Sequence, residues 1–350
     1  MSIVFGIDHG NNHVKALSTF TRKPLLLPSY FSRPSDLGDV EEDLLNQRDE
    51  LKLHRFFSNA YKDEVYVWGE DINKSKQFMI TNGKEGRYKQ KPYLLLSEFI
   101  MAYLVKESSD TNLFPDVTVV TGCPTREKGH AVEQELIKAF EGAHVVSIDG
   151  NDKIITVKEV FVMPQPLGTI LDLYLDDEGY VADDSYESKY VGVIDIGGGT
   201  VDIDGVKGLK RQKDDMDTFG PGVIDTYQRI ANFIVEADPY SGATRSKVEQ
   251  QLAAGTEGYK ISERSTIDIK EIKERVFREL AENLVNQVQS RWSTFTRFDE
   301  IILTGGGAAI PEIAEAFRTL DKDIKIIKNS QFANAKGFYK YGLSKTHKGN

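Results

Sequence analysis

Short apolar runs alternate with longer amphipathic stretches along the chain, and this alternation predicts a mixed α/β protein. Runs rich in β-branched residues predict strands at residues 3–7, 14–20, 23–28, 64–68, 117–120, 145–148, 154–162, 190–196, 201–206 and 298–304. Apolar residues spaced three or four apart predict helices at residues 92–106, 127–140, 165–174, 223–235, 246–261, 269–292 and 331–341. The apolar stripe of the segment 269–292 favours packing on a core over a coiled-coil partner face.

Two strands far apart in the chain end in the same way. The first ends in Asp8 and turns at Gly10, and the second ends in Asp195 and turns at Gly197. This repetition predicts two related halves, each of which brings a carboxylate and a glycine turn to a shared cleft.

This arrangement suits the binding of a nucleoside triphosphate. Glycines in a turn let backbone N–H groups approach a phosphate without a Cβ in the way. Mg²⁺ prefers one or two carboxylates, waters and phosphate oxygens, which Asp8 and Asp195 could supply. A single glycine turn is also a common steric device in hairpins, so neither turn is specific on its own.

A third glycine cluster follows the apolar run at residues 298–304. Gly305, Gly306 and Gly307 are followed by Pro311, which suits the first turn of a helix. A strand, three glycines and a helix N-terminus allow a planar ring or a phosphate to approach the backbone closely. The alternative is a flexible loop, although three glycines carry a large entropic cost on ordering.

The order of these segments resembles the five ATP-site segments of the actin superfamily. In this chain they are the Asp8 turn, residues 164–168, the Asp195 turn, the triple glycine, and residues 332–337. The resemblance spans residues 4 to 337, almost the whole chain. Within the superfamily, the stretches 8–15 and 332–339 resemble the plasmid-segregation actins of the ParM type. His9 and His13 depart from the commoner pattern, but the aspartate, turn glycine and lysine remain.

The resemblance implies an α/β chain with an actin-like fold, in which two RNase H-like domains flank a nucleotide cleft. Residues 1–164 with 331–350 are expected to form domain I, and residues 165–330 domain II. The charged segment at about 32–91 is expected to be a small inserted subdomain, the alternative being a solvated excursion. The acidic stretch 176–187 is a candidate domain junction.

The resemblance also implies roles for individual residues. Asp8 and Asp195 would hold Mg²⁺ and act in catalysis with Gln165, which occupies the position of the residue that orients the attacking water. Gln165 could instead cap a helix, Lys15 could be an exposed strand lysine, and Asp202 could assist in the second turn. The cofactor-binding set for ATP consists of Gly10, Asn11, Asn12, Lys15, Gly197, Gly198, Gly199, Thr200, Gly305, Gly306 and Gly307.

Composition narrows the set of partners. The 350 residues carry a formal net charge of −10, which disfavours direct binding of nucleic acid. A single cysteine, Cys123, excludes an intrachain disulfide framework and fits a reducing cytoplasm, and the six histidines lack ligand spacing for zinc. The apolar run 3–7 is too short for a signal peptide, and residues 93–105 are too few to span a membrane.

The expected function is therefore that of an actin-like ATPase, with GTP as an alternative nucleotide. The chain would polymerise with itself into a filament on binding ATP and Mg²⁺, and hydrolysis would weaken the polymer. The ParM-type resemblance implies plasmid DNA segregation through a DNA-binding adaptor on a centromere-like site. The alternatives are a sugar kinase of the same superfamily and a cell-shape actin not linked to plasmids.

Overall fold

The computed structural model describes residues 3–37, 52–62, 64–81, 86–106, 108 and 111–347. The chain divides into two compact units, of which the first comprises residues 1–187 with 332–350 and the second residues 188–331. The sequence suggested a division after residue 164. The structure instead groups residues 165–187 with the first unit, so the division falls at the end of the acidic stretch.

The first unit is built on an eight-stranded sheet with the order β3-β2-β1-β8-β10-β9-β5-β6. Its strands are β1 (Ile3–His9), β2 (His13–Ser18), β3 (Thr21–Pro28), β5 (Leu53–Ser58), β6 (Val65–Gly69), β8 (Leu113–Cys123), β9 (Gly142–Ile148) and β10 (Asn151–Pro164). β1 pairs antiparallel with β2 and parallel with β8, and β10 pairs parallel with β8. The carboxyl ends of β1, β8 and β10 therefore lie at the same edge of the sheet.

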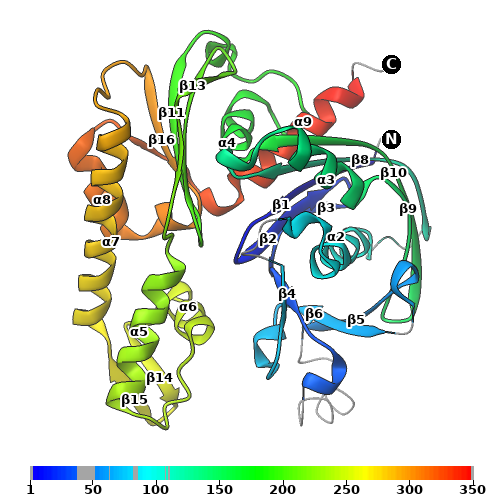
Figure 1. The fold of residues 1–350 in the computed structure, drawn as a ribbon, viewed down its shortest axis with the longest axis horizontal. Coiled ribbons are helices and arrows are strands. Elements are labelled where there is room, and N and C mark those ends of the chain that lie inside the picture. The colour runs from blue at the N-terminus through cyan, green and yellow to red at the C-terminus, as the bar shows by residue number, and fades with distance from the viewer. Residues whose placement is uncertain are drawn as a thin grey trace. The chain divides into compact units, whose positions relative to one another are not determined.

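Helices cover both faces of this sheet (Figure 1). On one face α2 (Lys91–Leu104) and α3 (His130–Phe140) enclose the larger core, in which Phe99 and Leu136 are fully buried. On the other face α4 (Gln165–Tyr174) and α9 (Ala333–His347) pack over Val120 and Met163, with Phe338 buried among them. The chain therefore returns to the first unit through α9.

The described part of the expected insertion does not stand apart from the main core. β5 and β6 extend the large sheet at its edge, and Phe56, Tyr66 and Trp68 are buried in the same cluster as Phe99. A second small sheet is formed by β4 (Tyr30–Phe31) and β7 (Met79–Ile80). Residues 38–51, 63 and 82–85 of the expected insertion lie outside the described residues.

The second unit repeats the strand arrangement on a smaller scale, with the sheet order β13-β12-β11-β16-β17. The strands are β11 (Tyr190–Ile196), β12 (Val201–Lys207), β13 (Lys210–Phe219), β16 (Glu300–Thr304) and β17 (Lys325–Ile326). As in the first unit, the first strand pairs antiparallel with the second and parallel with a later strand. The repetition predicted from the two aspartate turns is thus present in the strand pairing.

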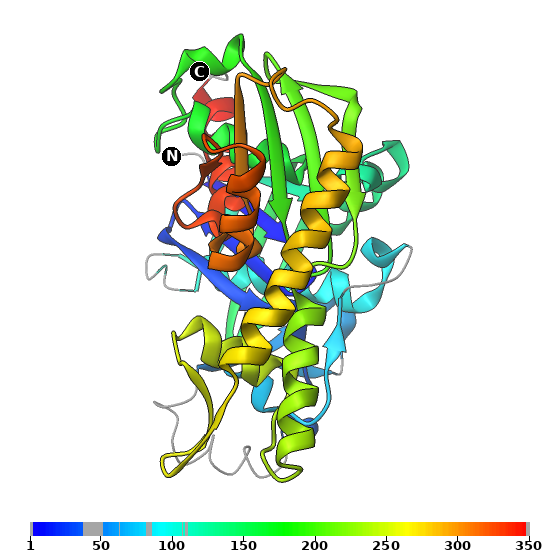
Figure 2. The same ribbon diagram turned by 90° about the vertical axis from the view of Figure 1, so that its left-hand side faces the viewer.

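The helices of this unit are α5 (Ile224–Ala237), α6 (Arg245–Ala253), α7 (Lys270–Arg291) and α8 (Pro311–Leu320). Figure 2 shows α7 running along the unit. Its C-terminal half buries Leu284 and Val288 against sheet residues such as Ile203, and its N-terminal half buries Val276 in a separate cluster with α5. The apolar stripe of α7 is therefore core packing, as its sequence favoured.

One predicted helix is wrong. Residues 246–261 do not form a continuous helix, because α6 ends at Ala253 and Gly255 adopts a positive φ of 78°. The chain then enters β14 (Gly258–Ser262), which pairs antiparallel with β15 (Ser265–Asp268). A glycine with positive φ is a common helix terminator, and here it overrides the helical spacing of the apolar residues.

No helix among the described residues is long and apolar enough to cross a membrane.

Candidate functional site

The turn between β1 and β2 is held by its own backbone and by Ser29, which follows β3. The amide of Gly10 donates to the carbonyl of His13 at 3.1 Å, which closes the turn. The hydroxyl of Ser29 donates to the carbonyl of Gly10 at 2.6 Å, and the amide of Ser29 donates to the carbonyl of Asn12 at 2.9 Å. These three hydrogen bonds hold the backbone of the turn.

Asp8 lies next to the end of β1 and is only 3% exposed. Antiparallel pairing places Lys15 opposite it, and Nζ of Lys15 contacts Oδ2 of Asp8 at 3.3 Å. Nε2 of Gln165 donates to the other carboxylate oxygen, Oδ1, at 2.6 Å. Pro164, and not Gln165, occupies the N-cap position of α4. The first unit thus brings together three of the residues expected to act on a nucleotide.

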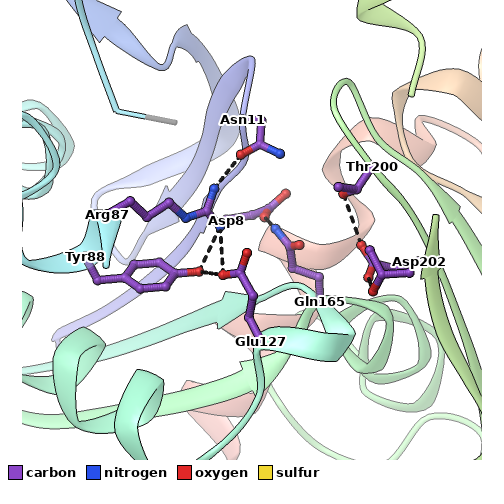
Figure 3. A network of polar contacts seen from close by, with 9 residues as sticks. Asp8, Asn11, Arg87, Tyr88, Glu127, Gln165, Thr200 and Asp202 are labelled. Atoms are coloured by element: carbon purple, nitrogen blue, oxygen red, sulfur yellow. Dashed lines mark hydrogen bonds and ion pairs between the residues drawn. The ribbon is translucent and has the colours of Figure 1, made fainter. Parts of the chain in front are cut away.

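Arg87 makes a polar network that the sequence did not reveal. Its guanidinium donates to Oδ1 of Asn11, to the hydroxyl of Tyr88 at 2.8 Å and to Oε2 of Glu127 at 3.3 Å, and the Tyr88 hydroxyl also donates to Glu127 (Figure 3). Burial acts to lower the pKa of Arg87, but Tyr88 and Glu127 raise it overall, so the guanidinium stays charged. Asn11, expected to contact phosphate, is therefore held by a buried cation.

His9 is buried behind the same turn. Its ring stacks on Tyr93 with centroids 4.2 Å apart, and its Nε2 lies 3.1 Å from the hydroxyl of Thr81. Burial, followed by the positive charges of Arg87 and Lys15, lowers the pKa of His9 to about 3. This histidine is therefore neutral at physiological pH and serves as a packing group under the turn.

The second turn, between β11 and β12, is closed by the same kind of backbone hydrogen bond as the first, but it is held by residues 222–224. The amide of Gly197 donates to the carbonyl of Thr200 at 2.9 Å. The carbonyls of residues 197–199 accept hydrogen bonds from the amides of Val223, Ile224 and Gly222, at distances of 3.3, 2.9 and 3.1 Å. A Cβ on Gly222 would overlap the carbonyl oxygens of this turn. The start of α5 is therefore packed directly against the glycine turn.

Asp195 and Asp202 lie on facing strands at this turn, paired in register and both buried. Asp202 accepts hydrogen bonds from the hydroxyls of Thr218 at 2.6 Å and Thr200 at 3.4 Å, the latter drawn in Figure 3. Asp202 thus orients Thr200, one of the residues expected to bind phosphate.

The triple glycine packs against the end of β11. Gly305 has a positive φ of 84°, and a Cβ there would overlap a carboxylate oxygen of Asp195. A Cβ on Gly307 would overlap the side chain of Ile196, whereas a Cβ on Gly306 would meet no atom within 4 Å. Ser330 donates to the carbonyl of Gly305 at 2.7 Å. Two of the glycines are thus required by packing, and Gly306 leaves open space.

Each of the two turns, taken by itself, has groups that suit the magnesium and phosphates of a nucleoside triphosphate. Asp8 and Asp195 are buried oxygen donors, and each is followed by a glycine turn with backbone N–H groups. Among the described residues, no cluster of three or more His, Cys, Asp or Glu side chains could hold a metal ion. Mg²⁺ needs no such cluster when phosphate and water complete its coordination. Asp8, Gly10, Asn11, Asn12, Lys15 and Gln165 belong to the first unit, and Asp195, Gly197–Thr200 and Gly305–Gly307 to the second.

Comparison with known families agrees with this architecture. Residues 6–168 match the family model of the N-terminal domain of actin-like proteins. Residues 193–315 match the model of the C-terminal domain of the MreB-like archaeal actin homologue. Together the two matches span most of the chain, which belongs to the actin-like proteins. No curated protein matches the chain.

Solved structures of actin-like proteins superpose on nearly the whole chain. The apo ParM protein of psk41 is 26% identical, with a TM-score of 0.73 over 99% of this chain and 98% of that one. A 15-stranded ParM filament from Clostridium botulinum is 18% identical, with a TM-score of 0.74 over 97% of this chain and 99% of that one. Bacillus thuringiensis ParM with ATP is 16% identical, with a TM-score of 0.70 over 100% of both chains. The actin-like fold expected from the sequence is confirmed.

Proposed function

We propose that this protein is an ATPase that binds ATP with Mg²⁺, polymerises into a filament and hydrolyses the nucleotide. The observation that supports this most directly is the arrangement around Asp8. A buried carboxylate beside a glycine turn is contacted by one cation, Lys15, and one neutral amide, Gln165. These are the groups that phosphoryl transfer requires, because it depends on positioning and on charge stabilisation.

Asp8 and Asp195 would hold the magnesium ion, mainly through water. The bound ion would supply neutralisation of the phosphate charge. Nζ of Lys15 lies 3.3 Å from Oδ2 of Asp8, and this ammonium group would contact the phosphates. The backbone amides of both glycine turns would donate to the phosphate oxygens, and the open space at Gly306 suits the adenosine.

Gln165 would orient the attacking water. An ionised carboxylate can only accept hydrogen bonds, so the group that faces Asp8 must be the amide NH₂ of Gln165. This hydrogen bond fixes the side chain and leaves its carbonyl oxygen as the acceptor for a water proton. A neutral amide cannot remove that proton, which favours slow hydrolysis over fast turnover.

Filament formation is supported by the likeness to ParM structures, one of which is a filament. We further propose that the filament segregates plasmid DNA in the cytoplasm through a DNA-binding adaptor bound to a centromere-like site. The net charge of −10 disfavours a direct role of this chain in binding DNA, which supports an adaptor.

Right-angle light scattering and electron microscopy test the proposal. Scattering is expected to rise on addition of ATP with Mg²⁺, to stay at baseline with EDTA, and to fall as phosphate is released. Filaments should be visible at the plateau. Nucleotide uptake without any filament would remove polymerisation from the proposal, and phosphorylation of a sugar in a substrate panel would replace it with a kinase activity.

A further inference from the structure

We propose that Arg87 is a positioning residue for the first glycine turn and that it sets the affinity of this turn for the phosphate groups of ATP. This inference rests on the proposed ATP binding. It goes beyond it by assigning a role to a segment, residues 86–90, that lies outside all five ATP-site segments recognised in the sequence.

The guanidinium of Arg87 connects three parts of the first unit. It donates to Oδ1 of Asn11 in the turn, to the hydroxyl of Tyr88 at 2.8 Å, and to Oε2 of Glu127 at 3.3 Å. Tyr88 lies beside Arg87 in a short 3₁₀ helix, η4 (Arg87–Lys89), and Glu127 ends another, η5 (Thr125–Glu127). With Glu127 and Tyr88 as anchors, the guanidinium is fixed where it meets Asn11 (Figure 3).

The contact with Arg87 engages the side chain of Asn11, whereas the hydrogen bonds that close the turn are made by its backbone and by Ser29. The last residue pair between β1 and β2 joins His9 to Val14, so residues 10–12 lie outside the paired strands. The oxygen of the Asn11 amide faces the guanidinium, and its nitrogen is therefore directed away from Arg87. This orientation suits an amide that donates to an anionic phosphate.

The chemistry of the contact favours arginine specifically. Arg87 is 9% exposed, and its two terminal nitrogens donate to these three partners, whereas its buried Nε–H has no hydrogen-bond partner within the described residues. A planar guanidinium can serve Asn11, Tyr88 and Glu127 at once, whereas a lysine ammonium cannot reproduce this fork. Glu127 offsets much of the positive charge of Arg87. We therefore attribute most of the effect of Arg87 on phosphate affinity to the orientation of the Asn11 amide, and less of it to charge.

Calorimetric titration of variants with ATP, ADP and AMP in the presence of Mg²⁺ tests this role. Arg87→Met is expected to weaken ATP binding about tenfold, the loss of roughly one hydrogen bond to a charged group, while AMP binding changes by less than about twofold. Arg87→Lys should recover only part of the loss. Asn11→Ala combined with Arg87→Met should cost no more than the larger single change, because the two residues act through one contact.

Arg211→Met is a matched control in the second unit. Arg211 contacts buried Asp204 at 2.8 Å, and its backbone pairs with Val206, five residues along β12 from the second turn. This variant should lower the thermal unfolding temperature without changing the ratio of ATP to AMP affinity. If Arg87→Met lowers ATP and AMP affinity equally, or leaves both unchanged, the positioning role is overturned.

The outcomes separate this inference from the proposed function. Wild-type protein that takes up ATP while Arg87→Met binds it equally well overturns the role of Arg87 alone. Wild-type protein that takes up no ATP overturns the proposed function and this role with it. If Arg87→Met does not fold, Tyr88→Phe removes one anchor of the guanidinium, and unchanged ATP affinity in that variant and in Arg87→Lys overturns the proposal.

Discussion

Gln165 and Asp8 are 157 positions apart in the chain, yet the amide of one donates to the carboxylate of the other at 2.6 Å. The sheet order explains the contact. β1, β8 and β10 run parallel, and α4 begins immediately after β10, so the first residue of α4 lies at the same sheet edge as the end of β1. The contact depends on topology and on no local sequence pattern.

Replacement of Gln165 with Ala is expected to lower kcat for ATP hydrolysis about 100-fold, because the attacking water loses its orienting group. Binding of ATP should change little, since the proposed role is exerted in the transition state. Steady-state phosphate release and calorimetry measure the two quantities separately. Gln228→Ala, on the exposed side of α5, is the control and should behave as wild type. Equal losses of kcat and affinity would contradict the assigned role.

Replacement of Asp195 with Ala is expected to abolish Mg²⁺-dependent hydrolysis while the protein stays folded. The carboxylate would be lost as a metal ligand, and the truncation removes no large apolar side chain. A malachite green phosphate assay and circular dichroism give the two readouts. Asp149→Ala, which removes an aspartate paired with His54 at 2.6 Å, should leave turnover intact. Normal turnover in Asp195→Ala would remove the metal assignment.

Gly337 in α9 packs against α4 so closely that a Cβ would overlap the carbonyl oxygen of Gly168. Gly337→Ala is therefore expected to destabilise the first unit by about 1–3 kcal/mol, the usual range for overpacking. The free energy of unfolding from urea denaturation measures this. Gly129→Ala is the matched control, because a Cβ there meets no atom within 4 Å. A comparable loss in both variants would show that α9 does not pack in this way.

Glu300 at the start of β16 forms ion pairs with Lys325 of β17 at 2.9 Å and with Lys189, which precedes β11, at 3.3 Å. Burial acts to raise the pKa of Glu300, but the two lysines lower it overall from the ordinary 4.5. The folded protein therefore holds this proton less tightly than the unfolded chain does. The stabilisation is present above pH 4.5 and is lost as pH falls through the lower folded pKa. Urea denaturation between pH 3 and 6 should show that the free energy of unfolding depends less steeply on pH in Glu300→Gln than in the wild type. An unchanged slope would contradict this role of Glu300.

Local signals in the sequence were sufficient for β11, which leads into the second turn, and for α4, which carries Gln165. α4 and β11 have the predicted bounds, because an X-Pro start and a β-branched run ending in Asp195 are strong local signals. The segment 246–261 was mispredicted, because its helical spacing continues past Gly255 into a hairpin. Local spacing does not reveal a hairpin whose partner strand, β15, is itself only four residues long.

The contact between Arg87 and Asn11 could not be predicted in the same way. Arg87 lies in a charged segment without a motif, 76 positions from Asn11. Its role depends on where the chain folds η4 against the turn, which is a tertiary property. Gln165, by contrast, was proposed from the sequence because residues 164–168 resemble one of the five ATP-site segments of the actin superfamily.

Isothermal titration calorimetry of the wild-type protein with ATP, in the presence and absence of Mg²⁺, tests the central claim most directly. The account predicts uptake of one nucleotide per chain that is strengthened by Mg²⁺ and is lost when Asp8 and Asp195 are both replaced with Ala. Absence of heat from the wild-type protein, or identical binding by the double variant, would contradict it.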